Sequence, residues 1–323
     1  MDAKITKKRL NDRLSYDWIK VIAVTLVVTL LWSLLYSVTG VSLSNGEEFK
    51  LLIVTDSYSR ETANDFTAKL ENSGRFSYGI QNVLFEYLGK GDYYDSLTLM
   101  VRLSEAEMDV AVFSDETSRD EDGNLKMDDD GYLKISAFRN FTDSYAVWDF
   151  DSAIAASYEY LKEFYKGGDL GDARVMDEQK VADNFRKNKL DNRFRTEAQI
   201  SAGIEMEKNR LEGYLKETRA LEAFLDSHPE AVVTYAKNAL SKEVDLYKHK
   251  DDPTYESTIE VEEEKRYGID LSFFPNAAEL CAGKDGTTKG CVLTVLNYYK
   301  RIGDLYFESF AAINYFLETY AAS

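Results

Sequence analysis

The longest apolar stretch of the chain has no formal charge from Val21 to Gly46. A hydrocarbon core of about 30 Å is spanned by roughly 20 mostly apolar residues in a helix. Trp18 precedes the stretch and Trp32 lies with Tyr36 near its far end, where amphipathic rings favour the membrane interface. The pattern therefore predicts a single transmembrane helix over residues 21–41.

The flanking charges predict the orientation of this helix. Residues 1–20 carry six basic and three acidic side chains, a net charge of +3, and such flanks stay in the cytoplasm. The apolar stretch exceeds the roughly 7 to 15 apolar residues of a signal peptide, and no A-x-A-like cleavage site follows it. We expect an uncleaved anchor in the cell membrane and an extracellular C-terminal domain, with a cleaved signal peptide as the alternative.

Hydroxylated side chains recur every fourth residue inside the predicted span, at Thr25, Thr29, Ser33 and Ser37. Residues four apart share one helix face, so this stripe could contact a second membrane helix. Alternatively, each hydroxyl donates to the carbonyl oxygen four residues earlier in a lone helix.

Beyond residue 48, strand-like and helix-like patterns alternate. Short apolar runs predict strands over residues 50–55, 80–87 and 108–113, and apolar spacings of three and four predict helices over 61–71 and 94–107. This order predicts a parallel α/β unit with right-handed crossovers.

Residues 150–255 have a different pattern and predict a helical subdomain. Apolar spacing predicts a long helix over 195–225. An S-x-x-E capping box begins at Ser227 and predicts a second helix over 228–247, so the two would form a helical hairpin. His228 is expected in the turn and His249 at the surface, neither as a ligand.

Strand patterns return at residues 267–271 and 292–297, before a final helix over 304–320. The expected architecture is a basic leader, a transmembrane helix and one α/β lobe. The lobe comprises residues 48–149 and 256–323, and the helical subdomain is inserted between its two parts.

Nine residues separate Cys281 from Cys291. In an oxidising exterior, a disulfide closing so short a loop would add roughly 2.5 to 3 kcal/mol. A redox or metal site would favour C-x-x-C spacing or a nearby histidine, and both are missing. We expect Cys281 and Cys291 to be bonded to each other.

Composition narrows the function classes. The chain has 39 basic and 57 acidic residues, a formal net charge of −18, which argues against nucleic-acid binding. There is no phosphate-binding glycine loop, no G-x-S-x-G and no H-E-x-x-H. We therefore expect a protein that is not an enzyme and has no cofactor or metal centre.

One acidic stretch, residues 115–131, resembles the start of a calcium loop at Asp120–Asn124. Leu125 stands where such a loop needs glycine, and Gly131 where it needs a bidentate glutamate. An acidic turn is the favoured interpretation, and calcium binding remains the alternative.

Four segments together resemble the extracellular solute-binding proteins of ABC importers, of the type II periplasmic-binding-protein-like class. They are Lys50–Thr55, Met108–Asp115, Tyr267–Ser272 and Val292–Asn297. In that family the turns after the first and third strands face the ligand, and an asparagine turn precedes the last helix. The resemblance implies one set of ligand-binding residues: Asp56, Ser57, Tyr58, Ser114, Asp115 and Asn297.

The resemblance implies a membrane-tethered, non-catalytic accessory or binding subunit of an ABC-type transporter complex. Its partner would be a membrane protein such as an ABC permease, and a small solute such as a sugar is a possible ligand. Because residues 150–255 predict no second sheet, we expect docking through the helical hairpin rather than trapping of a solute. The alternative is an envelope sensor or scaffold that uses the same fold for protein contacts.

Overall fold

The computed structural model describes residues 20, 22–33, 47–88, 101, 108–127, 131–187, 193–297 and 306–321. The chain divides into two compact units, residues 1–44 and 45–323. In the first unit, residues 22–33 are helical and exposed. Thr29 Oγ1 donates to the Thr25 carbonyl oxygen at 2.8 Å, which is the bond expected of a lone helix.

The membrane span over residues 21–41 stays a prediction, because residues 34–41 lie outside the described residues. Within the described residues, no helix combines the length and the apolar character needed to cross a membrane.

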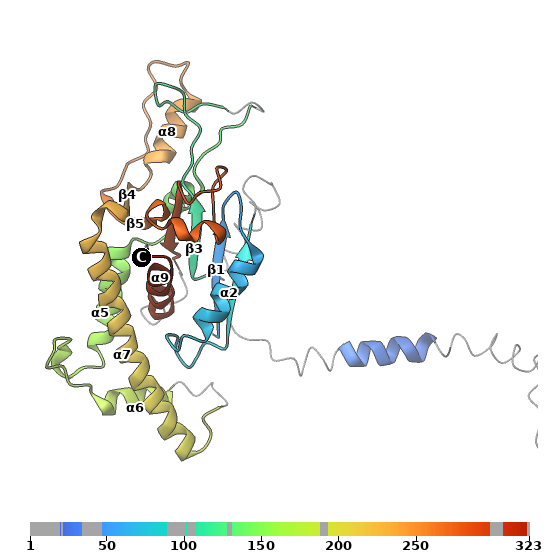
Figure 1. Ribbon diagram of the computed structural model, residues 1–323, viewed down its shortest axis with the longest axis vertical. Coiled ribbons are helices and arrows are strands. Elements are labelled where there is room, and N and C mark those ends of the chain that lie inside the picture. The colour runs from blue at the N-terminus through green and yellow to red at the C-terminus, as the bar shows by residue number, and fades with distance from the viewer. Residues whose placement is uncertain are drawn as a thin grey trace, which may run out of the picture. The chain divides into compact units, whose positions relative to one another are not determined.

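The second unit is built on a six-stranded mixed sheet with the strand order β2-β1-β3-β6-β5-β4 (Figure 1). β1 pairs in parallel with β2 and β3, whereas β6 is antiparallel to both β3 and β5, and β4 is antiparallel to β5. The strands are β1 (Glu48–Val54), β2 (Asn82–Tyr87), β3 (Val110–Ser114), β4 (Val232–Ala236), β5 (Glu264–Asp270) and β6 (Cys291–Val295).

The predicted α/β class and five of its strands are confirmed, but the sheet is not entirely parallel. The α-helices of this unit are α2 (Arg60–Glu71), α4 (Ala137–Asp143), α5 (Phe150–Lys162), α6 (Glu178–Lys187), α7 (Glu197–Ser227), α8 (Ala239–Lys248) and α9 (Tyr306–Tyr320). Short 3₁₀ helices are η1 (Lys166–Gly168), η2 (Pro229–Ala231), η3 (Leu271–Phe273) and η4 (Pro275–Glu279). The helix predicted over residues 94–107 lies almost entirely outside the described residues.

Both faces of the sheet are covered, so consecutive residues of its central strands are buried on opposite sides. On one side Ile53 and Val112 pack in a large core with α2, α5, α7 and α9. On the other side Val54 and Phe113 pack in a smaller core with α4 and α8. This arrangement explains the nearly unbroken apolar runs of β1, β3 and β6.

The predicted helical hairpin is wrong. α7 confirms the first helix, but residues 228–247 contain η2, the strand β4 and then α8. Valine, threonine and tyrosine in β4 suit a pleated strand, and pairing with β5 satisfies one of its edges. The residues after Ser227 thus extend the sheet instead of folding back along α7.

α7 packs within the unit along one of its faces. It packs against α9, where Asn314 Nδ2 donates to Glu217 Oε2 at 2.8 Å with both residues buried. At the other end of α7, a Cβ atom on Gly203 would lie 2.2 Å from Phe185 of α6. α7 is therefore an internal support for α9 and α6.

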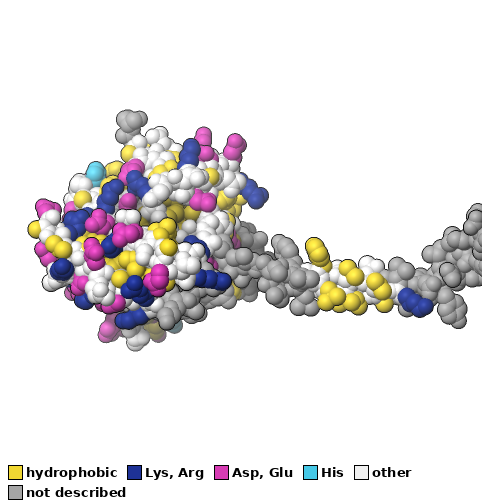
Figure 2. Space-filling model, turned by 90° about the horizontal axis from the view of Figure 1, so that it is seen from below, with side chains coloured by type: hydrophobic (Ala, Val, Ile, Leu, Met, Phe, Trp, Pro, Cys, Tyr) yellow, Lys and Arg dark blue, Asp and Glu magenta, His cyan; other side chains and the backbone are white. Residues whose placement is uncertain are grey.

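The surface of this unit mixes charges. On the face shown in Figure 2, acidic and basic side chains are interspersed with small apolar areas.

The buried tyrosines predict loss of stability in alkali. Burial is the main cause that raises the pKa of Tyr320 to about 12, and burial also raises the pKa values of Tyr267 and Tyr306. Each neutral phenol contributes stability that is fully present below the unfolded pKa of about 10 and is lost as pH rises through the folded pKa. Urea unfolding should show a lower free energy of unfolding at pH 11.5 than at pH 9.

Tyr320→Phe provides the matched variant for this prediction, because the phenylalanine cannot ionise. Its alkaline loss should be smaller than that of the wild type by as much as about 2 kcal/mol. An identical loss in both proteins would show that Tyr320 does not titrate as its burial requires.

Candidate functional site

Five of the six predicted site residues lie together at one edge of the sheet. β1 and β3 are parallel, so the turns that follow them meet at what we call the carboxyl edge. Asp56, Ser57 and Tyr58 follow β1, Ser114 ends β3, and Asp115 comes next.

Asn297 lies at the opposite edge, because β6 runs antiparallel to β3. The backbone N–H of Leu296 donates to the Asp109 carbonyl oxygen, just before β3 begins. Asn297 Nδ2 donates to the Tyr145 carbonyl oxygen at 3.1 Å. The predicted site is therefore split between two edges of the sheet.

The carboxyl edge is covered by residues 279–291, which we call the closing segment. Ser57 and Ala282 exchange two backbone hydrogen bonds of 3.0 Å, and the N–H of Ser59 donates to the Glu279 carbonyl oxygen at 2.8 Å. The N–H of Asp115 donates to the Gly290 carbonyl oxygen at 2.7 Å. The closing segment thus binds both turns that a ligand at this edge would need.

A tight turn lets the closing segment lie close to the end of β3. Gly290 has a positive φ of 71°, which an L-residue rarely adopts. A Cβ atom there would lie 3.5 Å from Cγ of Glu116. The side chain of Glu116 therefore lies against the closing segment.

Asp115 is engaged in holding α4. Its Oδ1 accepts from Ser136 Oγ at 2.5 Å and from Arg139 Nε at 2.8 Å, and its Oδ2 accepts from Arg139 Nη2 at 3.1 Å. Ser136 is itself the N-cap of α4 and accepts from the N–H of Arg139. Hydrogen bonding to Asp115 is the main cause that raises the pKa of Arg139. This carboxylate is therefore a structural anchor between β3 and α4.

Tyr58 is also engaged within the fold. Its ring stacks on Tyr87 with centroids 3.9 Å apart, and the Tyr87 hydroxyl donates to the Thr55 carbonyl oxygen. Ser114 is buried, Asp56 is half-buried, and Ser57 has an exposed side chain. The carboxyl edge therefore offers little free polar surface to a solute.

Around Asn297, at the opposite edge, the structure places a lysine that the sequence did not single out. Lys237 Nζ lies 3.7 Å from the ring centroid of Tyr145, a non-glycine residue with a positive φ of 62°. Burial is the main cause that lowers the pKa of Lys237. The side chain is a buried cation held against aromatic rings, which fixes the end of β4 on the core.

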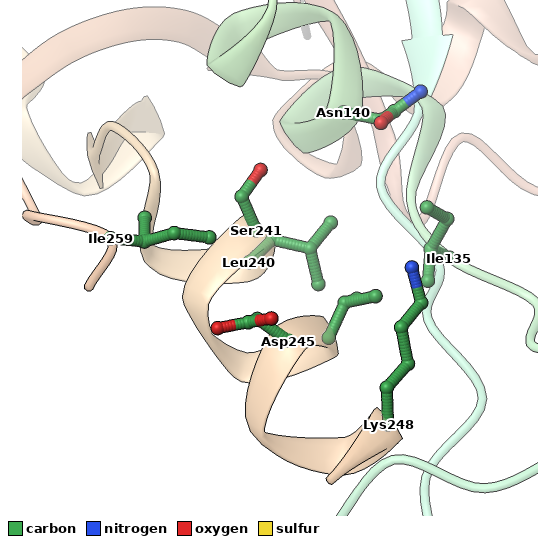
Figure 3. A pocket seen from close by; sticks show the side chains of 8 residues that line it. Ile135, Asn140, Leu240, Ser241, Asp245, Lys248 and Ile259 are labelled. Carbon is green, nitrogen blue, oxygen red and sulfur yellow. The ribbon is translucent and has the colours of Figure 1, made fainter. Parts of the chain in front are cut away.

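A pocket of about 260 Å³ lies between α4 and α8 (Figure 3). Asp143 of α4 positions α8, since its carboxylate accepts from the N–H groups of Asn238 and Ser241 at 2.6 and 2.9 Å. The residues that line the pocket are Ile135, Asn140, Leu240, Ser241, Val244, Asp245, Lys248 and Ile259. This pocket was not predicted from the sequence, because residues 228–247 were expected to form one continuous helix without the strand β4.

The acidic stretch after β3 forms a hairpin-like arm. Bridges join Arg119 to Leu125 and Met127 to Leu133. The N–H groups of Asp122 and Asn124 donate to Asp120 Oδ1, and hydrogen bonding to Asn124 is the main cause that lowers the pKa of Asp120. In the part of the chain that the structure describes, which omits residues 128–130, no group of three or more potential metal ligands occurs.

Cys281 and Cys291 are buried thiols, and the predicted disulfide between them is not formed in the structure. Burial raises the pKa of the Cys281 thiol well above its usual value. The thiolate is the species that attacks in disulfide exchange, so burial slows oxidation. Both side chains pack in the larger core as small apolar groups.

Comparisons with known proteins identify no relative. The chain matches no protein-family model, no curated protein and no solved structure.

The anchoring role of Asp115 predicts a stability effect. Asp115→Ala should lower the free energy of unfolding by about 2 kcal/mol, because the donors of Ser136 and Arg139 lose their acceptor. Glu121→Ala, at an exposed residue of the acidic arm, is the matched control and should change it by less than about 0.5 kcal/mol. Equal effects of the two substitutions in chemical unfolding would contradict this role.

Because both thiols are buried, we expect them to react slowly with alkylating reagents in the folded protein. Without reductant, Cys281 and Cys291 should resist alkylation in the native state and react with two equivalents of reagent after unfolding. Intact-mass measurement checks this prediction. A protein that takes up no reagent after unfolding would instead contain the disulfide.

Proposed function

We propose that this protein is a membrane-tethered, non-catalytic accessory subunit that works by docking with another membrane protein. The observation that carries the proposal is the closure of the carboxyl edge by the closing segment. In open α/β sheets, ligands bind beyond the carboxyl ends of the strands. Here that position is filled by the chain itself, so capture of a solute is disfavoured.

The membrane location rests on the sequence. The uncharged stretch from Val21 to Gly46 and the net charge of +3 over residues 1–20 support a single-pass anchor with the N-terminus in the cytoplasm. The domain of residues 45–323 would then be extracellular. Its excess of acidic over basic residues favours solubility and disfavours adhesion to anionic lipids.

The transporter context of the proposal rests on the resemblance of four sequence segments to the solute-binding proteins of ABC importers. β2-β1-β3 is a parallel βαβ-type group, as the resemblance to solute-binding proteins of ABC importers implies. The described residues between 45 and 323 contain one sheet, whereas those proteins close two α/β lobes over a solute. An ABC permease is our proposed partner because the sequence resemblance implies it, and the lack of a second sheet among the described residues keeps an envelope scaffold or sensor as the alternative.

The proposal predicts the outcome of a solute screen. Sugars, amino acids and short peptides at millimolar concentration should leave the midpoint of thermal unfolding of the full-length protein unchanged within about 1 °C, because no open site stabilises the folded state. Differential scanning fluorimetry in mild detergent provides the measurement.

A solute that raises the midpoint by several degrees, with the rise lost in Tyr58→Ala, would contradict the docking proposal and support capture. Tyr132→Ala is the control for this substitution, because Tyr132 is an exposed tyrosine remote in sequence from the turns of the carboxyl edge. Co-purification of a permease from the native membrane would favour the transporter subunit over the scaffold.

A further inference from the structure

The smaller core supports a projection made of two segments, the acidic arm (residues 118–127 and 131–134) and residues 239–264. Both lie at the end of the 45–323 unit that carries α8 (Figure 1). Arg119 of the arm forms an ion pair with Glu243 of α8, with 2.5 Å between Nη1 and Oε1. We call these two segments the α8 projection.

Large apolar side chains are exposed on the α8 projection. Met127 and Tyr132 of the arm are 51% and 73% exposed, and Leu246 and Val261 are each 43% exposed. These side chains are available for contact with a partner protein.

The pocket between α4 and α8 lies at the base of this projection. Its apolar walls are Ile135, Leu240, Val244 and Ile259. At about 260 Å³ it is smaller than the roughly 300 to 1,000 Å³ of sites that hold a drug-sized molecule, so it suits a single apolar side chain.

The polar side chains of Asn140 and Lys248 line the pocket, whereas the carboxylate of Asp245 already accepts hydrogen bonds within the fold. Asp245 Oδ2 accepts from Tyr255 and Ser257, at 2.9 and 2.5 Å. Figure 3 shows Asp245 turned away from the cavity that Lys248 and Asn140 approach. Donors of this kind can bind the backbone carbonyl groups of an extended segment.

The net charge of residues 239–264 indicates the sign of the partner's charge. Residues 239–264 contain three lysines and nine carboxylates, a net charge of −6 with His249 neutral. Glu256, Glu260 and Glu263 are exposed and form no ion pair with the described residues. An acidic segment of this kind attracts a positively charged partner and repels an anionic one.

We propose that the pocket receives one apolar side chain of an extended, basic segment of the docking partner. The apolar side chain packs against Val244 and Ile259, Lys248 donates to the backbone of the segment, the Asn140 amide forms a hydrogen bond with it, and the unpaired glutamates attract its lysines or arginines. This inference deepens the proposed function and rests on it, because it names the chemistry of the docked partner.

A labelled peptide, Lys-Lys-Leu-Lys-Lys, tests the inference on the full-length protein in mild detergent. Fluorescence anisotropy at low salt should show saturable binding of this peptide. Replacing its leucine by serine should weaken binding about tenfold, and the acidic peptide Glu-Glu-Leu-Glu-Glu should not bind. Equal binding of the leucine and serine peptides would overturn the pocket as the site.

Two exposed or half-buried apolar residues provide matched variants. Ile259→Ser should weaken peptide binding about five- to tenfold, because Ile259 lines the pocket. Val175→Ser, at an exposed valine outside the α8 projection, should leave it within twofold. A combined change of Glu256, Glu260 and Glu263 to glutamine should weaken binding and flatten its dependence on salt. Equal effects of Ile259→Ser and Val175→Ser would contradict the proposal.

A photo-reactive leucine analogue in the same peptide keeps the test independent of folding defects. In the wild-type protein its adduct should map to Leu240, Val244 or Ile259, and an adduct elsewhere would contradict the proposal. If the peptide does not bind, the pocket is not the docking site, and the docking proposal is then tested by the solute screen alone. A solute captured at the carboxyl edge would instead remove the docking proposal.

Discussion

The antiparallel insertion of β6 between β3 and β5 determines what each edge of the sheet can do. Because β6 runs against β3, Cys291 lies opposite Ser114 and the chain must reach β6 from the carboxyl edge. The closing segment precedes β6 and therefore lies across the turns that follow β1 and β3. The same strand direction sends Asn297 to the opposite edge, so one pairing both covers the expected ligand position and divides the expected site.

The apolar pattern predicted the strands far better than their directions. Val292–Leu296 is apolar except for the central Thr294, and its pattern is the same in either direction, so nothing in it distinguishes a parallel neighbour of β3 from an antiparallel one. Direction depends on the long-range pairing of β6 with β3, whose residues lie between 177 and 185 positions earlier in the chain. Asn297 was therefore grouped with Ser57 and Asp115 although the fold separates them.

β4 shows a second limit of prediction from the sequence. Val232–Ala236 is only five residues long and lies between two helical segments, and the S-x-x-E pattern at Ser227 favours a helix start. The pairing of Val232 and Val233 with Ile269 and Gly268 prevails over that local signal. The pocket between α4 and α8 could not be foreseen, because it depends on this strand ending just before Asn238, where φ is positive.

Closure of the carboxyl edge and exposure of the α8 projection both favour our proposal of docking with another protein over capture of a solute. The polar groups expected to hold a solute are used within the fold, as Asp115 is by Arg139 and Ser136. The exposed apolar side chains and unpaired glutamates lie instead on the projection, which suits contact with another protein.

Amide hydrogen exchange at the carboxyl edge tests the central claim most directly. The N–H groups of Ser57, Asp115 and Ala282 donate to backbone carbonyl groups within the unit. If the closing segment permanently covers this edge, these amides should exchange slowly, at rates that added solutes do not change. Rapid exchange that becomes slow when one solute is added would show that the edge opens to bind ligands, and would contradict the account.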